Sequence, residues 1–220
     1  KTDPDATFMR LKEDHMRNGQ LKPAYNVQIA VNSEYLTGLE VFSDRTDVKT
    51  LRPMLNMLSR RHQARYEEVV ADAGYESLEN YLYLEQNGQL CFIKPTNYDQ
   101  KKTKKFRKQV GRIENMKYAP EEDSFTCAQG RKLHLRREAT EVRDGQLVST
   151  AWYRCENCSG CPHRAQCCRA KAPDKPKEII LKKTFWEKRE QATRNIMTER
   201  GIQLRLCRSI QVEGTFGLLK

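Results

Sequence analysis

Residues 24–95 carry an ordered series of strand-like and helix-like patterns, and this series constrains the fold more than any other feature of the sequence. Over 24–32, apolar side chains alternate with polar ones, which is the period of a half-buried strand; the apolar positions are Tyr25, Val27, Ile29 and Val31. A short Asn-Ser-Glu connection leads to a second apolar run over 36–42. The two segments together predict a β-hairpin.

The next segment has the spacing of an amphipathic helix. Apolar side chains recur at helical intervals at Leu51, Met54, Leu55 and Leu58. Pro53 is compatible with this helix only in its first turn, where no backbone hydrogen bond is lost. We therefore predict a helix at about 48–63.

A strand–helix–strand unit follows. Residues 67–72 are too few for a helix and predict a buried strand that ends at Asp72. Ser77 is a suitable cap for a helix that ends at Gly88, and an apolar strand follows over 90–93. A hairpin followed by such a unit predicts an α/β fold, a mixed sheet with helices packed on it.

The charge balance indicates the kind of partner. The 220 residues include 40 Lys and Arg against 29 Asp and Glu, a net charge of +11, which favours a polyanion, and nucleic acid before membrane. No apolar run approaches 18 residues, and the charged opening over 1–10 is unlike a secretory signal. We expect a soluble, cytoplasmic chain with no membrane partner.

The regular pattern fails between Tyr98 and about Lys183. Within it, residues 101–112 contain seven Lys or Arg. Two compatible interpretations are a solvated loop and a segment that contacts DNA phosphates. The candidate DNA contacts are Lys101, Lys102, Lys104, Lys105, Arg107 and Lys108.

Five of the eight cysteines fall within residues 155–168, a clustering that favours local metal binding over disulfides. The C-x2-C-x2-C-x5-C run offers four thiolates to one ion; they are Cys155, Cys158, Cys161 and Cys167. Zinc is the first choice, an iron–sulfur cluster and a metal-free thiol cluster are the alternatives, and Cys127 or His163 would be able to replace one sulfur. Such a site is closed to substrate, so we expect it to hold together an insertion with too little core of its own.

The last block is helical by pattern. Thr184 and Glu187 form a capping-box sequence, which predicts a helix over 185–200 that ends at Gly201. Apolar residues continue at four-residue spacing beyond it, and the sequence stops at Lys220 without a capping signal, so we expect a fragment of a longer protein.

If residues 212–220 are also helical, Glu213 and Lys220 share a face with Gly217 between them. A phosphodiester backbone would approach this face closely, with the lysine on a phosphate and the glutamate on a metal ion. The alternative is an ordinary helix whose charges face water.

Two motifs, VVADAGYES at 69–77 and RSIQVEGTFGLLK at 208–220, occur with a TDPDA opening at 2–6, an AYNVQ strand at 24–28 and the cysteine-rich stretch. In this order and spacing they resemble the bacterial insertion-sequence transposases of the DDE class. The resemblance implies a ribonuclease-H-like mixed sheet with flanking helices, incomplete at the N-terminus and interrupted by the Cys-rich insertion.

In that class three acidic side chains hold two Mg²⁺ (or Mn²⁺) ions. The resemblance implies that Asp72 is the second acid and Glu213 the third, and that Lys220 is the DNA-contacting lysine. The arginine of the class sits four residues before the glutamate, at Ser209 here; Arg208 is one position earlier and is carried over on that basis.

The first acid of the class lies before the TDPDA stretch, and no residue of this sequence matches it; Asp3 and Asp5 flank a proline in a predicted loop. The resemblance divides the chain into the N-terminal part of the catalytic core (1–97), a basic, metal-stabilised insertion (98–183) and C-terminal helices that complete the core (184–220).

The implied function is metal-dependent DNA strand cleavage and strand transfer at insertion-sequence ends, in a homo-oligomer bound to transposon ends and target DNA. With one acid missing, we expect little or no cleavage by this chain alone. The alternatives are a non-catalytic DNA-binding module and an inactive transposase remnant.

Overall fold

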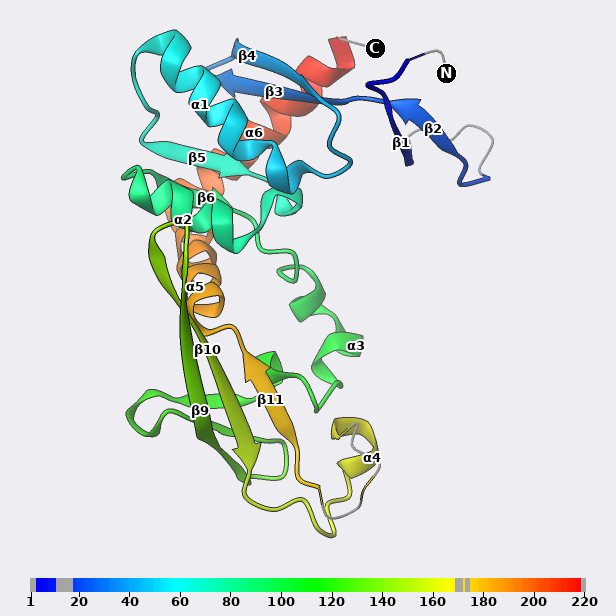
Figure 1. Ribbon diagram of the computed structural model, residues 1–220, viewed down its shortest axis with the longest axis vertical. Helices are drawn as coiled ribbons and strands as arrows, with labels where there is room; N and C mark the ends of the chain where they lie inside the picture. Colours follow the sequence, from blue (N-terminus) through cyan, green and yellow to red (C-terminus); the bar gives the residue numbers. More distant parts are fainter. Residues whose placement is uncertain (1–2, 11–17, 169–171, 173–174, 219–220) are drawn as a thin grey trace. The chain divides into compact units, whose positions relative to one another are not determined.

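The computed structural model describes residues 3–10, 18–168, 172 and 175–218 (Figure 1). The chain divides into two compact units, a first unit of residues 1–95 and 191–220 and a second unit of residues 96–190. Both helices and strands occur in the first unit, and an antiparallel sheet dominates the second, so the α/β class is confirmed in its coarse form. The predicted mixed sheet is not found among the described residues, because the hairpin strands and the parallel strand pair form separate two-stranded sheets. None of the helices in the described ranges is both long enough and apolar enough to cross a bilayer.

Two hairpin-like pairs open the first unit. Strands β1 (Thr7–Arg10) and β2 (Leu21–Ala24) pair antiparallel, as do β3 (Asn26–Asn32) and β4 (Tyr35–Phe42). The β3–β4 turn places Ser33 and Glu34 at φ of 48° and 73°, the left-handed conformation that matches the twist of a two-residue hairpin. The predicted hairpin is confirmed.

The strand–helix–strand unit is also confirmed. A 3-10 turn η1 (Asp47–Lys49) and helix α1 (Leu51–His62) precede this unit. The unit itself consists of β5 (Glu68–Ala71), the 3-10 turn η2 (Ala73–Tyr75), α2 (Leu78–Gln86) and β6 (Leu90–Ile93), in the order predicted. Strands β5 and β6 are parallel, and the Ser77 hydroxyl accepts from the Asn80 amide at 3.1 Å as the cap of α2. The cap and the helical period are local signals, which is why the sequence predicts these elements well.

The β3–β4 hairpin buries the opposite face from the one predicted. Gln28 is only 6% exposed, whereas Val27 and its cross-strand partner Val41 are 39% and 52% exposed. Gly38 explains the difference, because a Cβ there would lie 2.7 Å from the Leu58 side chain of α1. The small residues of the hairpin therefore admit α1 closely, and the more apolar face stays partly exposed.

The described chain ends in two helices, as the C-terminal pattern predicted, but the break between them lies at Thr198 and not at Gly201. Helix α5 (Lys183–Met197) is followed by α6 (Glu199–Leu218), and Thr198 caps α6 by accepting from the Gly201 amide at 3.0 Å. The predicted capping box is wrong as well, because α5 starts before Thr184 and the Thr184 hydroxyl accepts from the Ser149 amide at 2.8 Å. A tertiary hydrogen bond therefore uses the group that the local pattern assigned to a cap.

The second unit is a five-stranded antiparallel sheet in the order β11-β10-β9-β8-β7. Its strands are β7 (Lys117–Ala119), β8 (Ser124–Thr126), β9 (Lys132–Arg143), β10 (Gln146–Cys155) and β11 (Glu178–Leu181). The second unit also contains the short helices α3 (Lys104–Arg107) and α4 (Arg164–Cys167). Its 3-10 turns are η3 (Gln100–Lys102), η4 (Ile113–Asn115) and η5 (Pro120–Glu122). Figure 1 shows β9, β10 and β11 side by side.

The second unit has a hydrophobic core of its own, which corrects the expectation of an insertion without one. The buried members are Met116, Phe125, Leu133, Ala151, Tyr153, Cys155, Ile179 and Leu181. They come from four strands and a loop that are distant in sequence, so no single segment shows the pattern of the whole. The functional division of the chain at 97 and 183 stays a prediction.

Candidate active site and cysteine cluster

Asp72 stands immediately after β5, at the start of η2. Its Oδ1 accepts a hydrogen bond from the Gly74 amide at 2.9 Å, which is the role of an ordinary turn residue. Its Oδ2 accepts from Nη2 of Arg208 at 3.1 Å. The Asp72 side chain is 45% exposed, so solvent and ligands reach it.

The ion pair joins two segments that are 136 residues apart in the sequence. Arg208 lies in α6, and α6 contacts both β3 and β5. The helix that carries Glu213 therefore runs beside the strand that ends at Asp72. Arg208, one position away from the place expected from the resemblance, contacts this acid from α6.

The remaining predicted members of the site cannot be placed by their side chains. Glu213 belongs to α6, five positions after Arg208, but its side chain lies outside the described part of the structure, and so does Lys220 altogether. The convergence of the Asp72 and Glu213 carboxylates therefore stays a prediction.

A second carboxylate, which the sequence interpretation missed, lies beside Asp72. A Cβ on Gly74 would stand 2.8 Å from Oδ2 of Asp47 and 3.1 Å from Oδ1 of Asp72, so both carboxylates border the same small space. Asp47 is held there by Asn26 and Gln28, whose side-chain amides donate to its Oδ1 at 2.9 and 3.1 Å. The sequence feature that would have pointed to Asp47 is the polar pair Asn26 and Gln28 within a predicted strand, of which Gln28 is buried in the structure.

Tyr75 completes this polar cluster. Its hydroxyl donates to Oε1 of Gln28. Burial raises the pKa of Tyr75, and the carboxylates of Asp47 and Asp72 raise it further, while Arg208 opposes them. The phenol therefore stays protonated and acts as a donor at neutral pH.

The donors at this place have the chemistry that Mg²⁺ requires. Carboxylate oxygens from Asp47 and Asp72 are hard ligands, and Mg²⁺ keeps several waters beside one or two of them. Within the described residues, no group of three or more His, Cys, Asp or Glu side chains is arranged to hold an ion. Any third carboxylate would have to come from a side chain such as that of Glu213.

The basic segment is structured and partly paired. Lys101 pairs with Glu190 at 3.4 Å, and Lys102 pairs with Asp99 at 3.4 Å and stacks on the Tyr98 ring at 4.0 Å.

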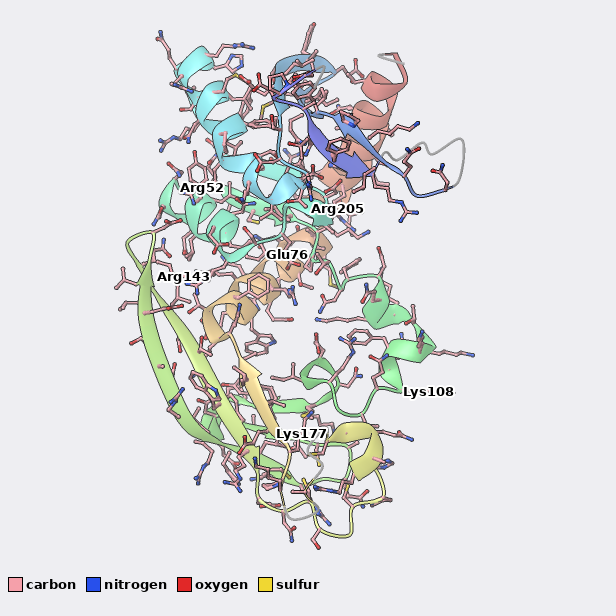
Figure 2. All side chains as sticks on the ribbon, turned by 45° about the vertical axis from the view of Figure 1, so that its right-hand side comes forward. Arg52, Glu76, Lys108, Arg143, Lys177 and Arg205 are labelled. Carbon is pink, nitrogen blue, oxygen red and sulfur yellow. The ribbon has the colours of Figure 1, made fainter. Side chains whose placement is uncertain are left out.

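The other four candidate DNA contacts of the segment have no carboxylate partner among the described residues. Arg107 donates to the backbone carbonyl of Lys101 at 3.4 Å. Among the described residues, Lys104, Lys105 and Lys108 make no ion pair; Figure 2 labels Lys108, which follows α3. These lysines are free to meet an anion.

The cysteine-rich turn lies next to the turn that contains Cys127. Arg131, which follows that turn, donates to the carbonyls of Asn157 and Ser159 at 2.8 and 3.1 Å. The Lys177 amide donates to Sγ of Cys158 at 3.2 Å; Figure 2 labels this lysine.

The thiols of this region influence one another's ionisation. Burial raises the pKa of Cys155 to about 12, and the thiols of Cys158 and Cys127 add to the shift. Burial also raises the pKa of Cys167, Lys177 opposes the rise, and Cys127, Cys158 and Cys168 contribute. All eight cysteines are free thiols, and the described side chains include no group of three or more cysteines arranged to hold an ion, so the metal site expected at Cys155, Cys158, Cys161 and Cys167 stays a prediction.

Comparison with known proteins finds a family model that matches part of the chain. The family model described as "Transposase DDE domain" matches residues 126–220. Neither a curated protein nor a solved structure matches the chain. The resemblance to DDE-class transposases predicted from the sequence is confirmed over the matched residues, which include Arg208, Glu213 and Lys220 but not Asp72.

Proposed function

We propose, starting from the match of residues 126–220 to the transposase DDE domain family, that this chain is part of a transposase that cleaves DNA at insertion-sequence ends and joins the freed end to target DNA. Asp72 and Glu213 are the proposed acids of the site, and Asp47 is a further carboxylate beside them. The observation that carries the proposal is the Arg208–Asp72 ion pair, because it brings the helix that bears Glu213 to the end of β5.

The proposed chemistry consists of two phosphoryl transfers. A water oxygen attacks the phosphorus at the transposon end and loses its proton, and the bond from phosphorus to the 3′ oxygen breaks, which frees a 3′ hydroxyl. That hydroxyl then attacks a phosphodiester of the target, and the target's own 3′ oxygen leaves. Two Mg²⁺ or Mn²⁺ ions, when bound, would activate the attacking oxygen and stabilise the leaving one.

The residues of this chain have defined parts in that scheme. The carboxylates of Asp72 and Glu213 would hold the ions, and Asn26 and Gln28 keep Asp47 aimed at the same space. Arg208 would serve as a positioning residue that orients the Asp72 carboxylate before metal enters. Lys220 would contact DNA phosphate.

We further propose a ribonuclease-H-like arrangement for the first unit. The order hairpin, helix, strand, helix and parallel strand supports it, because β5 and β6 are joined through α2 and α6 packs beside β3 and β5. Homo-oligomerisation in the complete complex and a cytoplasmic location belong to the same proposal.

Zinc is the proposed ion of the cysteine turns. Four thiols at the C-x2-C-x2-C-x5-C spacing are a suitable donor set for tetrahedral zinc. The proposed ligands are Cys155, Cys158, Cys161 and Cys167, with Cys127 able to replace one of them; because the described side chains are not arranged as a metal site, this proposal rests on the spacing of the cysteines in the sequence. Because the second unit already has a core, zinc would add stability to it without being the only source of stability.

Iron-directed backbone cleavage tests the proposed catalytic site without requiring turnover. Fe²⁺ with ascorbate and peroxide, substituted at a Mg²⁺ site, cuts the polypeptide near its ligands. We expect cuts near residues 47, 72 and 213 that excess Mg²⁺ suppresses. Asp72→Asn should abolish them, because it removes a carboxylate from the centre of the site.

Asp144→Asn is the matched control, since it makes the same charge change at the β9–β10 turn and asparagine tolerates the φ of 47° found there. Cuts that persist in Asp72→Asn, or that Mg²⁺ fails to suppress, would show that Asp72 is only the turn residue that its bond to Gly74 suggests. A plasmid-nicking assay with Mg²⁺ runs alongside, and we expect little or no nicking from these 220 residues alone.

A further inference from the structure

The positive charge of the chain is concentrated in one unit. The second unit, residues 96–190, contains 23 Lys or Arg and 13 Asp or Glu, a net charge of +10, while the first unit contains 17 and 16, a net charge of +1. The unit that carries the proposed catalytic acids is thus nearly neutral. The electrostatic attraction for a polyanion resides in the second unit.

The sheet of the second unit has two chemically different faces. One face covers the hydrophobic core, and Lys183 lies on that side with Asp123 at 3.1 Å and Glu138 at 3.7 Å. On the other face, Trp152 of β10 lies opposite Arg137 of β9, and the two form a cation–π pair with the guanidinium carbon 4.0 Å from the ring centroid.

A β-bulge brings a second arginine to the same place. The register of β9 and β10 shifts between Trp152 and Tyr153, so that Arg136 has no direct partner across the ladder. In a regular strand two consecutive side chains point to opposite faces, but a bulge re-aims one of them. Both Arg136 and Arg137 consequently line one hollow.

This hollow has a volume of about 210 Å³ and is lined by Arg136, Arg137, Trp152, Tyr153, Arg154 and Glu178. Arg154 faces Glu178 at 3.6 Å in a partly exposed pair, the one carboxylate of the lining. Among the described side chains, Arg136 and Arg137 have no carboxylate partner, and both are exposed. We call Arg136, Arg137, Trp152 and Arg154 the arginine–tryptophan face.

We propose that the arginine–tryptophan face is a DNA-binding surface that grips backbone phosphates. The guanidinium group is planar and presents paired donors that match the phosphate oxygens, and Trp152 holds Arg137 in place so that less side-chain freedom is lost on binding. Three arginines against one glutamate leave the hollow positive. The choice of DNA as the polyanion rests on the proposed function; the location of the surface rests on the geometry and charge described above.

The surface differs from the basic segment proposed from the sequence. It is formed by two paired strands, whereas Lys101–Lys108 is a single stretch of chain around η3 and α3. Neither the four side chains nor their association follows from a contiguous motif, because Arg137 and Trp152 meet only through the β9–β10 register.

The test measures the affinity of the 220-residue chain for a fluorescent DNA duplex by anisotropy, in EDTA so that no catalytic metal contributes. The double variant Arg136→Gln/Arg137→Gln removes the two unpaired guanidinium groups. If each contacts one phosphate, the slope of log K against log salt falls by about 1.8, and affinity at 0.1 M salt falls by roughly 10- to 60-fold.

The chain offers a matched control in Arg60→Gln/Arg61→Gln, an adjacent arginine pair on the exposed end of α1. It removes the same charge from the first unit and should change affinity less than threefold. Circular dichroism of both variants establishes that they are folded. Equal losses in the two variants, or an unchanged salt slope in Arg136→Gln/Arg137→Gln, would overturn the proposal.

A second readout follows Trp152 directly. In a Trp186→Phe background Trp152 is the remaining tryptophan, and duplex DNA should shield it from acrylamide quenching. Unchanged quenching at saturating DNA would also overturn the proposal. Tighter binding of single-stranded RNA than of the duplex would replace DNA by RNA as the partner and refute the proposal in its stated form.

The outcomes separate this inference from the proposed catalysis. Loss of DNA binding in Arg136→Gln/Arg137→Gln with iron-directed cuts intact at residue 72 supports both. DNA binding that is insensitive to these arginines refutes only the surface. Absence of Mg²⁺-suppressible cuts refutes only the catalytic site.

Discussion

Gly201 is the position at which one methyl group should have the largest effect on the first unit. It lies in the first turn of α6, and a Cβ added there would stand 2.1 Å from the carbonyl oxygen of Asn195 and 2.8 Å from Cα of Ile196. Real Cβ atoms do not approach backbone atoms so closely, and backbone cannot swing away as the end of a long side chain can. Gly201→Ala must therefore displace α6 relative to α5.

The expected change in the free energy of unfolding is the sum of two opposing contributions. Replacing glycine by alanine within a helix stabilises it by up to about 1 kcal/mol, and forcing an extra carbon into a packed position costs about 1–3 kcal/mol or more. Gly214, in the same helix, has no heavy atom within 4 Å of its hypothetical Cβ, so only the favourable contribution applies there. Since the helix contribution is common to both variants, we expect the stability of Gly201→Ala and Gly214→Ala to differ by the packing cost, about 1–3 kcal/mol or more, with Gly201→Ala less stable and Gly214→Ala more stable than the parent chain.

The two tryptophans allow the effect to be localised. Trp152 and Trp186 both belong to the second unit, so tryptophan fluorescence follows the unfolding of that unit, while far-UV circular dichroism follows both units. Gly201→Ala should lower the dichroism transition and leave the fluorescence transition in place. If Gly201→Ala is as stable as Gly214→Ala, the close approach of α6 to the end of α5 does not exist, and the positioning of Arg208 next to Asp72 loses its structural basis.

Two further predictions concern the second unit. Burial opposes the ionisation of Asp123, but hydrogen bonds from Tyr118 and Tyr153 at 2.7 Å and from Lys183 outweigh it and lower the pKa of Asp123 below its usual 3.8. The stabilisation that the ionised carboxylate provides is therefore present above pH 3.8 and disappears as the pH falls through the lowered pKa. Asp123→Asn should flatten the acid side of the curve of stability against pH measured by fluorescence. A curve that keeps its acid slope in this variant would assign the slope to other groups. The purified chain should contain one zinc ion, and removing that ion with a chelator should lower the midpoint of the unfolding transition detected by fluorescence. Cys158→Ser should lose the metal, whereas Cys207→Ser, which changes an exposed thiol, should retain it. A metal content near zero in the parent chain, or an equal content in the two variants, would contradict the zinc assignment.

The sequence by itself determined the elements whose signals are local. The β3–β4 hairpin, α1, β5, α2 and β6 were predicted nearly to their ends, because each carries its own period, cap or turn within a few residues. The same reasoning identified Asp72 as a residue at a strand end. It also identified the basic segment and the cysteine run, since both are contiguous.

Tertiary structure alone decided the features that join distant segments. The second unit draws its core from residues between Met116 and Leu181, so no window of the sequence displays it, and its five-stranded sheet lies in a region where the regular sequence pattern fails. Thr184 follows the cap pattern, but its hydroxyl oxygen accepts a hydrogen bond from the Ser149 backbone amide instead, because a tertiary partner outcompetes a local one.

The candidate site shows the same division. The Arg208–Asp72 pair and the approach of Asp47 depend on how α6 and the β4–α1 connection pack against β5, which is a property of the folded chain. Local patterns record only interactions between residues within a few positions of each other. Contacts over more than a hundred positions are selected by the simultaneous burial of many side chains, and for that reason they became visible only in three dimensions.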